Sequence, residues 1–227
     1  MTAQTMQIGN RPCRIYGEAH AEYLLLQMTG EHELQSMESE IAAIAQSAHH
    51  FLFAAIPVES WNDALSPWEA PAVWGKQGFG GKATETLCFL TEQVIPTLKQ
   101  QFRLPEDIKI ILGGYSLAGL FALYALYQTD VFARAASMSG SFWFEGIMEY
   151  VCSHEMKRKP DCLYFSLGDK ESSTDNPILN VVQQNTQEIE TLCHGKGIET
   201  TFVLNSGSHY QACNKRTAAG IHWILNR

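Results

Sequence analysis

The sequence predicts an α/β fold in which a mostly parallel central sheet is covered by helices on both faces. Segments rich in apolar and β-branched residues alternate along the chain with segments of helical periodicity. The predicted strands are apolar throughout, rather than at every second residue, which is typical of parallel strands buried on both sides. No internal repeat or low-complexity linker divides the 227 residues. We therefore expect residues 1–227 to form one domain.

The first half of the chain combines strands, two helices and one long irregular stretch. The predicted strands span residues 13–16, 22–28, 51–56 and 108–112, and the predicted helices span residues 33–47 and 84–101. The first helix is predicted because Leu34, Met37 and Ile41 recur at helical spacing. The second contains Pro96, which is expected to kink it because proline lacks a backbone donor. Residues 57–81 between them are rich in proline, tryptophan and glycine and are expected to be irregular.

The second half alternates regularly. A helix is expected to follow Ser116 up to about Gln128. After it come predicted strands at 134–138, 162–167 and 199–204 and predicted helices at 144–152, 178–194 and 211–225. Ligands of such sheets bind beyond the carboxyl ends of the strands. The segments that follow the strands are therefore the candidates for a site, and they are residues 29–31, 57–61, 116, 139–143, 168–171 and 206–210.

Ser116 lies in the segment Gly114-Tyr115-Ser116-Leu117-Ala118, at a junction between a predicted strand and a predicted helix. This is the G-x-S-x-A variant of a nucleophile elbow. The turn is so tight that side chains two residues before and after the serine would collide, so only small residues fit there. The alternative is a glycine-rich turn that only packs closely or holds a phosphate. The strand before and the helix after favour a nucleophile.

A nucleophilic serine needs an adjacent base, and a third group must orient that base. With this kind of elbow the partners follow in the order serine, acid, histidine. His209 lies after the last predicted strand, in a turn before the closing helix, and is the preferred base. The other late histidines fit less well, since His194 ends a helix and His222 lies within one. If His209 is not the base, it is a surface histidine that caps the closing helix.

The segment Gly168-Asp169-Lys170-Glu171 offers two carboxylates after the strand at 162–167. A carboxylate three residues after a strand-terminal glycine is the usual arrangement in this fold, which favours Glu171 over Asp169. Asp175 is a more distant third choice. The acid would hold the imidazole tautomer and stabilise the imidazolium without taking the proton.

Two backbone N–H groups are expected to stabilise the developing oxyanion. One belongs to Leu117, at the positive end of the helix that begins after the elbow. The other is assigned to Glu31, in the loop Thr29-Gly30-Glu31 after the strand at 22–28.

Five segments, read together, carry a family resemblance. They are Leu24-Leu25-Leu26-Gln27-Met28-Thr29-Gly30, Ala54-Ala55-Ile56-Pro57, Glu92-Gln93-Val94-Ile95-Pro96, residues 114–124 around Ser116, and Ser139-Gly140-Ser141-Phe142-Trp143. They resemble the esterase D type of α/β-hydrolase, which includes enterochelin (siderophore) esterases, feruloyl esterases and related acyl hydrolases. The resemblance covers about residues 22–227. It implies the α/β-hydrolase fold and carboxylic-ester hydrolysis through an acyl-enzyme, with Ser116 as nucleophile, His209 as base, and Leu117 and Glu31 as oxyanion donors.

The chain departs from this family in three ways. It has Thr29-Gly30 where members usually carry Asp-Gly, and Ala118 where they usually carry glycine. Its N-terminal part is short, so we expect an N-terminally shortened fold that lacks an opening strand or two.

Aromatic residues are concentrated in the irregular stretch and after the strand at 134–138. Trp61, Tyr115 and Trp143 are expected to contact substrate, in an aromatic cleft that also includes Trp68, Trp74 and Phe79. Alternatively, these aromatics bury a long loop against the sheet.

Composition excludes several other classes. The net charge of −8 and the lack of a basic patch argue against nucleic acid. No apolar stretch approaches the roughly 18–20 residues of a membrane span, and the first ten residues do not resemble a signal peptide. The six cysteines make no C-x-x-C pair, so we expect free thiols and a reducing cytoplasm. His49 and His50 have no partner at ligand spacing, so we expect no metal.

The sequence therefore predicts a cytoplasmic serine esterase that acts on a small-molecule ester without metal or cofactor. An acyltransferase or thioesterase with the same triad is an alternative. A catalytically weak hydrolase-fold binding protein is a further one. The sequence leaves the oligomeric state open, a homo-oligomer included.

Overall fold

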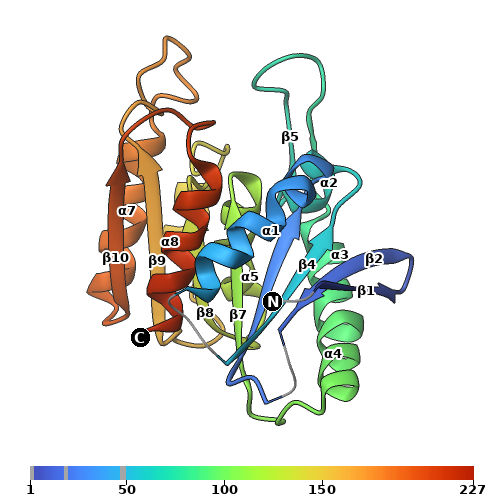
Figure 1. Ribbon diagram of the computed structural model, residues 1–227. Coiled ribbons are helices and arrows are strands. Elements are labelled where there is room, and N and C mark those ends of the chain that lie inside the picture. Colours follow the sequence, from blue (N-terminus) through green and yellow to red (C-terminus); the bar gives the residue numbers. More distant parts are fainter. Residues whose placement is uncertain (1–2, 18–19, 47–49) are drawn as a thin grey trace.

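The computed structural model describes residues 3–17, 20–46 and 50–227. These residues contain an eight-stranded sheet at the centre of the molecule (Figure 1). Its spatial order is β1 (Ala3–Ile8), β2 (Arg11–Tyr16), β4 (Phe51–Pro57), β3 (Tyr23–Thr29), β7 (Lys109–Tyr115), β8 (Phe132–Met138), β9 (Cys162–Gly168) and β10 (Glu199–Asn205). Strand β2 pairs antiparallel with both β1 and β4, and the strands from β4 to β10 pair in parallel. The mostly parallel sheet agrees with the sequence prediction.

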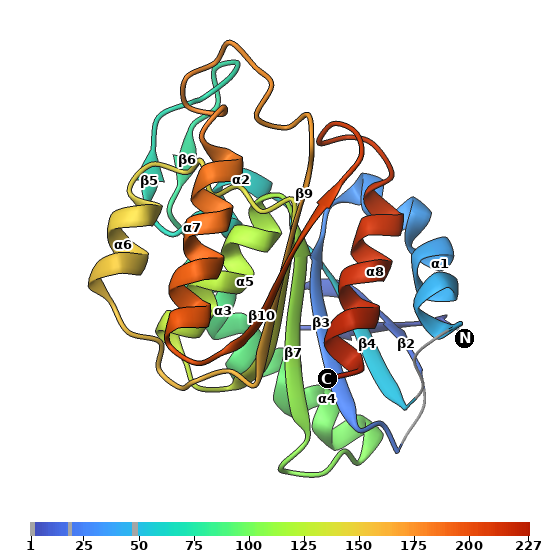
Figure 2. The same ribbon diagram turned by 90° about the vertical axis from the view of Figure 1, so that its left-hand side faces the viewer.

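Helices cover both faces of this sheet (Figure 2). One face carries α1 (Glu31–Ala45) and α8 (Cys213–Leu225), over a core that includes Phe53, Ile111 and Ile221. The other face carries α3 (Ala83–Phe89), α4 (Ile95–Phe102), α5 (Leu117–Gln128), α6 (Ile147–Ser153) and α7 (Val182–Gly195). Every residue of α5 from Leu117 to Tyr127 is buried. A helix that is apolar on all sides can only sit in the interior, so α5 is enclosed between the sheet and the outer helices.

The N-terminal region contains a strand that the sequence did not predict. Residues 3–8 form β1, and β2 is longer than the predicted strand at 13–16. The pattern of β1 is polar because most of its side chains are exposed, and only Ile8 at its end is buried. Edge strands of this kind have no apolar run that would identify them.

The predicted kink near Pro96 takes a specific form. Between α3 and α4 the chain makes a π-helical segment, η1 (Leu90–Val94), and Pro96 lies in the first turn of α4. Proline cannot donate the backbone hydrogen bond that an unbroken helix needs at that point. The π-helical turn absorbs this interruption, so the predicted helix at 84–101 is two helices joined by η1.

The stretch predicted to be irregular contains short elements. Helix α2 (Trp61–Leu65) is followed by a small hairpin of β5 (Glu69–Ala70) and β6 (Phe79–Gly80). The loop between β5 and β6 rises above the carboxyl ends of the parallel strands (Figure 1). This stretch therefore borders the edge of the sheet where a site is expected.

Two further features concern the cysteines and the helices. All six cysteines are free thiols. In the part of the chain that the structure describes, no helix is both long enough and apolar enough to cross a membrane. Of the two adjacent histidines, His49 lies outside the described residues.

Candidate active site

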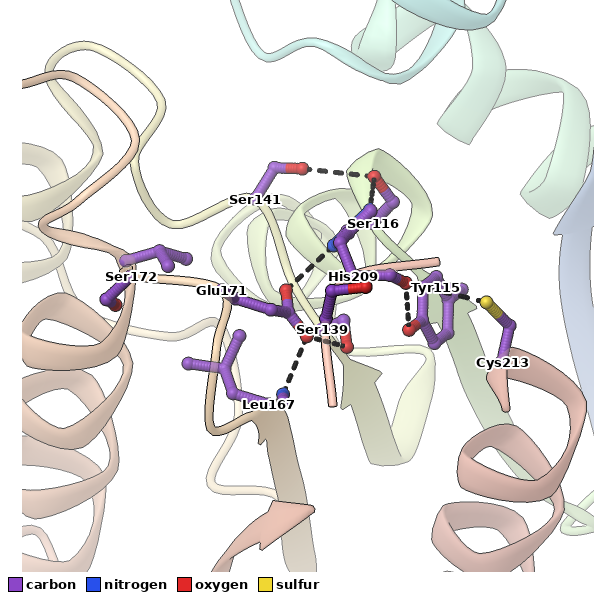
Figure 3. A network of polar contacts seen from close by, with 12 residues as sticks. Tyr115, Ser116, Ser139, Ser141, Leu167, Glu171, Ser172, His209 and Cys213 are labelled. Atoms are coloured by element: carbon purple, nitrogen blue, oxygen red, sulfur yellow. Dashed lines mark hydrogen bonds and ion pairs between the residues drawn. The ribbon is translucent and has the colours of Figure 1, made fainter. Parts of the chain in front are cut away.

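Three side chains that are far apart in the sequence meet at the carboxyl edge of the sheet (Figure 3). Ser116 follows β7, Glu171 follows β9, and His209 lies between β10 and α8. The serine and histidine are separated by 93 residues, and the histidine and glutamate by 38. Parallel strands end at one edge, so the order of the strands in the sheet brings these loops together.

The backbone at Ser116 is strained. Its φ of 58° and ψ of −122° lie in a region that non-glycine residues rarely adopt. A Cβ atom added at Gly114 would lie 2.3 Å from the carbonyl carbon of Ala118 and 2.6 Å from its Cβ. The turn therefore requires glycine at position 114 but accommodates the alanine at 118. Ser116 is further held because its N–H donates to the carbonyl of Met138 at 3.0 Å.

His209 contacts both other side chains. Its Nε2 lies 3.1 Å from the Ser116 hydroxyl oxygen, and its Nδ1 lies 2.7 Å from Glu171 Oε2. When Nδ1 carries the proton, it donates to the carboxylate, and Nε2 is left to accept from the serine. The imidazole side chain is 26% exposed, so the ring borders solvent while its carboxylate partner does not.

The Glu171 side chain is only 4% exposed. Its Oε1 accepts from the Ser139 hydroxyl at 2.7 Å, the Gly168 backbone N–H at 2.6 Å and Arg216 Nη1 at 3.0 Å. Burial raises the pKa of Glu171, but hydrogen bonds from His209, Ser139 and the Gly168 backbone outweigh it and lower the pKa below its ordinary value. The carboxyl group is therefore ionised near neutral pH.

The other two candidate acids lie elsewhere. Asp169 is exposed, and its Oδ1 accepts from the Gly207 backbone N–H at 2.8 Å. It thus supports the loop that carries His209 without contacting the ring in any recorded hydrogen bond. Asp175 is also exposed, in the loop that precedes α7.

The two predicted oxyanion donors are the first residues of helices at this same edge. Leu117 begins α5 and Glu31 begins α1. Strands β3 and β7 are neighbours with Gln27 opposite Gly113, so Glu31 and Leu117 follow aligned strand residues at equal spacing. The first N–H groups of a helix have no partner within it and lie at the positive end of its dipole. Both helices therefore begin with N–H donors of this kind at the same edge of the sheet, and their role as oxyanion donors stays a prediction.

Three aromatic side chains, those of Trp74, Phe79 and Trp143, form a cluster. The ring of Trp143 lies 5.3 Å from that of Trp74 and 5.9 Å from that of Phe79, and Trp74 is 53% exposed. Trp143 comes two residues after Ser141, whose hydroxyl oxygen is 3.4 Å from that of Ser116. This cluster joins the loop between β5 and β6 to the segment after β8.

The other aromatic candidates have different surroundings. Trp61 is partly buried against the core, and Trp68 donates from Nε1 to the carbonyl of Glu145 at 2.9 Å. Tyr115 was expected to contact substrate, but it is buried, and its hydroxyl donates to the backbone carbonyl of His209 at 2.7 Å. Successive residues along a strand point to opposite faces of the sheet, so the side chain of Tyr115 does not point in the same direction as that of Ser116.

Two residues around Glu171 were not identified from the sequence. Ser139 lies in a motif that the sequence did reveal, directly after β8, but its role as a donor depends on the loop at 168–171. Arg216 is 3% exposed and shares a face of α8 with Gly220 and Ile224, which are also buried. A charged residue on the buried face of a helix was the available signal.

Comparisons with known proteins show the family and the fold of this chain. The sequence model of the Esterase family, described as "Putative esterase", matches residues 31–215. A curated relative, "Uncharacterized protein YbbA" of Bacillus subtilis (strain 168), is 23% identical over 207 residues, which cover 87% of this chain and 81% of the relative.

Solved structures share the fold. An IroE-like serine hydrolase from Shewanella oneidensis superposes with a TM-score of 0.80 at 17% identity, over 98% of this chain and 79% of that one. The siderophore hydrolase EstA from Aspergillus nidulans gives 0.72 at 18% identity, over 99% and 94%. The enterobactin esterase FES from Shigella flexneri gives 0.74 at 16% identity, over all of this chain but 60% of that one.

These likenesses confirm both the α/β-hydrolase fold and the resemblance inferred from the sequence. The family model covers most of the chain, including the elbow and the loop of His209. The protein belongs to the Esterase family and is a carboxylic-ester hydrolase.

Proposed function

We propose that the protein cleaves a small carboxylic ester through an acyl-enzyme formed on Ser116. The observation that carries the proposal is the pair of contacts made by His209, with Ser116 at 3.1 Å and Glu171 at 2.7 Å. A base in contact with both a strained serine and a buried carboxylate matches the roles of a catalytic triad.

Acylation begins when Ser116 Oγ attacks the ester carbonyl carbon and its proton passes to His209 Nε2. The carbonyl oxygen becomes an oxyanion that the N–H groups of Leu117 and Glu31 stabilise. Loss of one such donor costs about 3 kcal/mol of transition-state stabilisation. When the intermediate collapses, the carbon–oxygen bond to the leaving group breaks, and His209 returns the proton to the departing alcohol.

Deacylation repeats these steps with water. His209 takes a proton from a water molecule, whose oxygen attacks the acyl carbon, and the same proton then returns to Ser116 Oγ. Glu171 stays ionised throughout, which its lowered pKa supports, and offsets the positive charge on the imidazole ring. The products are a carboxylic acid and an alcohol.

Trp143, with Trp74 and Phe79, is proposed to contact the acyl or alcohol part of the substrate. These rings form a connected apolar cluster, Trp143 comes two residues after Ser141 beside Ser116, and half of Trp74 is available to solvent. Several structural neighbours are named as siderophore hydrolases or enterobactin esterases, so a dihydroxybenzoyl ester belongs in the substrate panel. Thioester hydrolysis and acyl transfer would use the same acyl-enzyme, and a panel with thioesters and added alcohols separates these outcomes.

The test is labelling with a fluorophosphonate probe, which phosphonylates an activated serine. We expect the wild type to be labelled, Ser116→Ala to remain unlabelled and His209→Ala to react far more slowly. Ser153→Ala is a control, because Ser153 is an exposed serine in α6 whose hydroxyl contacts the Glu149 carbonyl and a histidine nitrogen, Nδ1 of His154, away from the triad. An unlabelled wild type, or labelling that survives in Ser116→Ala, would refute the proposal.

A further inference from the structure

We propose that Arg216 is a positioning residue that aligns the acid and the base of the triad and extends the activity of the enzyme toward lower pH. The inference deepens the proposed function and rests on its assignment of Glu171 and His209. Arg216 does not touch the nucleophile, so it would act through these two residues.

The guanidinium of Arg216 contacts groups on four separate segments. Its Nη1 lies 3.0 Å from Glu171 Oε1, 3.2 Å from the Tyr115 hydroxyl and 3.4 Å from the Ser139 hydroxyl. Its Nη2 donates to the backbone carbonyl of Ser206 at 3.1 Å. The planar guanidinium fork can satisfy acceptors in different directions at once, which a lysine ammonium on a flexible stem does less well. One buried side chain of α8 thus connects the end of β7 with the loops after β8, β9 and β10.

These contacts fix the direction of the Glu171 carboxylate. Three donors meet at Oε1, which leaves Oε2 for His209. The base is held from its other end as well, since Tyr115 accepts from Arg216 and donates to the His209 carbonyl. The ring and the carboxylate are therefore oriented through one common residue.

The Arg216 guanidinium is tightly packed against the end of β9. A Cβ atom added at Gly168 would lie 2.2 Å from the Gly207 carbonyl oxygen and 2.8 Å from Arg216 Nη2. Only glycine at this strand end lets the loops after β9 and β10 approach the guanidinium together. The close approach accounts for a glycine whose φ does not itself demand one.

The charge of Arg216 has a consequence of its own. Several other ionisable groups surround Glu171 and His209. They are Asp169 after β9, Tyr115 at the end of β7, Cys213 and Arg216 on α8, and Tyr210 beside His209. Arg216 is the buried cation in this set, and it stabilises the ionised carboxylate while opposing a second positive charge on the imidazole ring. Its removal would favour both the imidazolium and the protonated carboxyl group at a given pH. Each change lowers the fraction of enzyme that has both a neutral imidazole and an ionised carboxylate. The acid limb of the pH–activity profile therefore moves to higher pH.

The experiment compares Arg216→Met and Arg216→Lys with the wild type by pH profiles of kcat/KM for a short p-nitrophenyl ester. For Arg216→Met we expect kcat at the pH optimum to fall at least tenfold with KM within twofold, and the acid limb to rise by roughly one pH unit, the size expected for one nearby charge in a partly buried site. For Arg216→Lys, which keeps the charge, we expect a similar loss of kcat but an acid limb within about 0.3 units of the wild type.

Arg134→Met is the matched control for loss of a buried arginine. Arg134 is also 3% exposed and donates to the carbonyl of Ile224 in the last turn of α8, away from Glu171. We expect this variant to be less stable but to keep the wild-type acid limb. Thermal unfolding of each variant identifies any that do not fold.

The outcomes separate this inference from the proposed triad. An unmoved acid limb in Arg216→Met, or wild-type kcat in Arg216→Lys, overturns the role of Arg216 even if Ser116 is labelled by the fluorophosphonate. If Arg216→Met does not fold, the kcat and acid limb of Arg216→Lys still decide the positioning role. Failure of labelling in the wild type, by contrast, refutes the triad itself.

Discussion

The hydroxyl of Tyr115 donates a 2.7 Å hydrogen bond to the backbone carbonyl of His209. Tyr115 is bonded directly to Ser116 in the chain, so the residue beside the proposed nucleophile holds the backbone of the proposed base. The distance between the two reacting side chains therefore depends on a contact that involves neither of them.

Replacing Tyr115 with phenylalanine tests this contact. We expect Tyr115→Phe to lower kcat about tenfold, because a misplaced base loses much of the benefit of a positioned proton transfer. The free energy of unfolding should fall by about 1–2 kcal/mol, because the hydroxyl makes two hydrogen bonds, to His209 and from Arg216, each worth about 1 kcal/mol net. Tyr150→Phe is the control, since its hydroxyl accepts from Gln128 away from the triad. Equal kcat values in Tyr115→Phe and the wild type would show that the contact does not position His209.

The choice between two acids can be decided by isosteric substitution. Glu171→Gln should lower kcat by up to ~10⁴-fold, because an amide cannot stabilise the imidazolium or hold its tautomer in the same way. Asp169→Asn should lower it less than tenfold, since an amide oxygen can still accept from the Gly207 N–H. Initial rates with one p-nitrophenyl ester check both. The reverse order of effects would make Asp169 the acid.

Acid should destabilise the fold partly through Glu171. Its pKa is lowered in the folded state, so its contribution to stability is present above the unfolded value, about 4.5, and is lost as the pH falls through the folded value. Urea unfolding between pH 3 and 6 should therefore show a shallower loss of stability for Glu171→Gln than for the wild type. Asp161→Asn is a useful comparison, because Asp161 lies outside the active site and its pKa is also lowered. Burial raises the pKa of Asp161, but the hydrogen bond and charge of Lys109 outweigh burial. Parallel curves for Glu171→Gln and the wild type would contradict the assignment.

The turn around Ser116 should tolerate substitution at position 118 but not at position 114. Gly114→Ala would put a Cβ atom 2.3 Å from the Ala118 carbonyl carbon, so we expect loss of about 1–3 kcal/mol of stability and of nearly all activity. Ala118→Gly introduces no such conflict and should keep kcat within a few-fold. Thermal unfolding and fluorophosphonate labelling measure the two effects. An active, stable Gly114→Ala variant would mean that the backbone can relax around the serine.

Trp74 offers a test of the aromatic cluster. Because its side chain is 53% exposed, Trp74→Ala should change the unfolding temperature little. It should raise KM for an aryl ester several-fold while leaving KM for an acetyl ester nearly unchanged. Equal effects on both esters would indicate that Trp74 does not contact the substrate.

Local patterns predicted much of the fold and the residues that meet at the candidate site. The buried strands were visible because each is a continuous apolar run, and the loops of Ser116, Glu171 and His209 follow from the order in which such strands end. Strand β1 was not visible, because its exposed side chains carry no such run. The contacts of Arg216 and Tyr115 could not be read from the sequence, because each joins segments that are far apart in the chain.

The location of His209 and Arg216 late in the chain has a consequence for biosynthesis. A chain that has been translated only as far as β9 already contains the strained serine and its helix, but neither the base nor the guanidinium. The strand β10 and helix α8 must emerge from the ribosome and dock before the nucleophile can be activated. We therefore expect Ser116 to be unreactive during most of translation and to become reactive only when the sheet is complete.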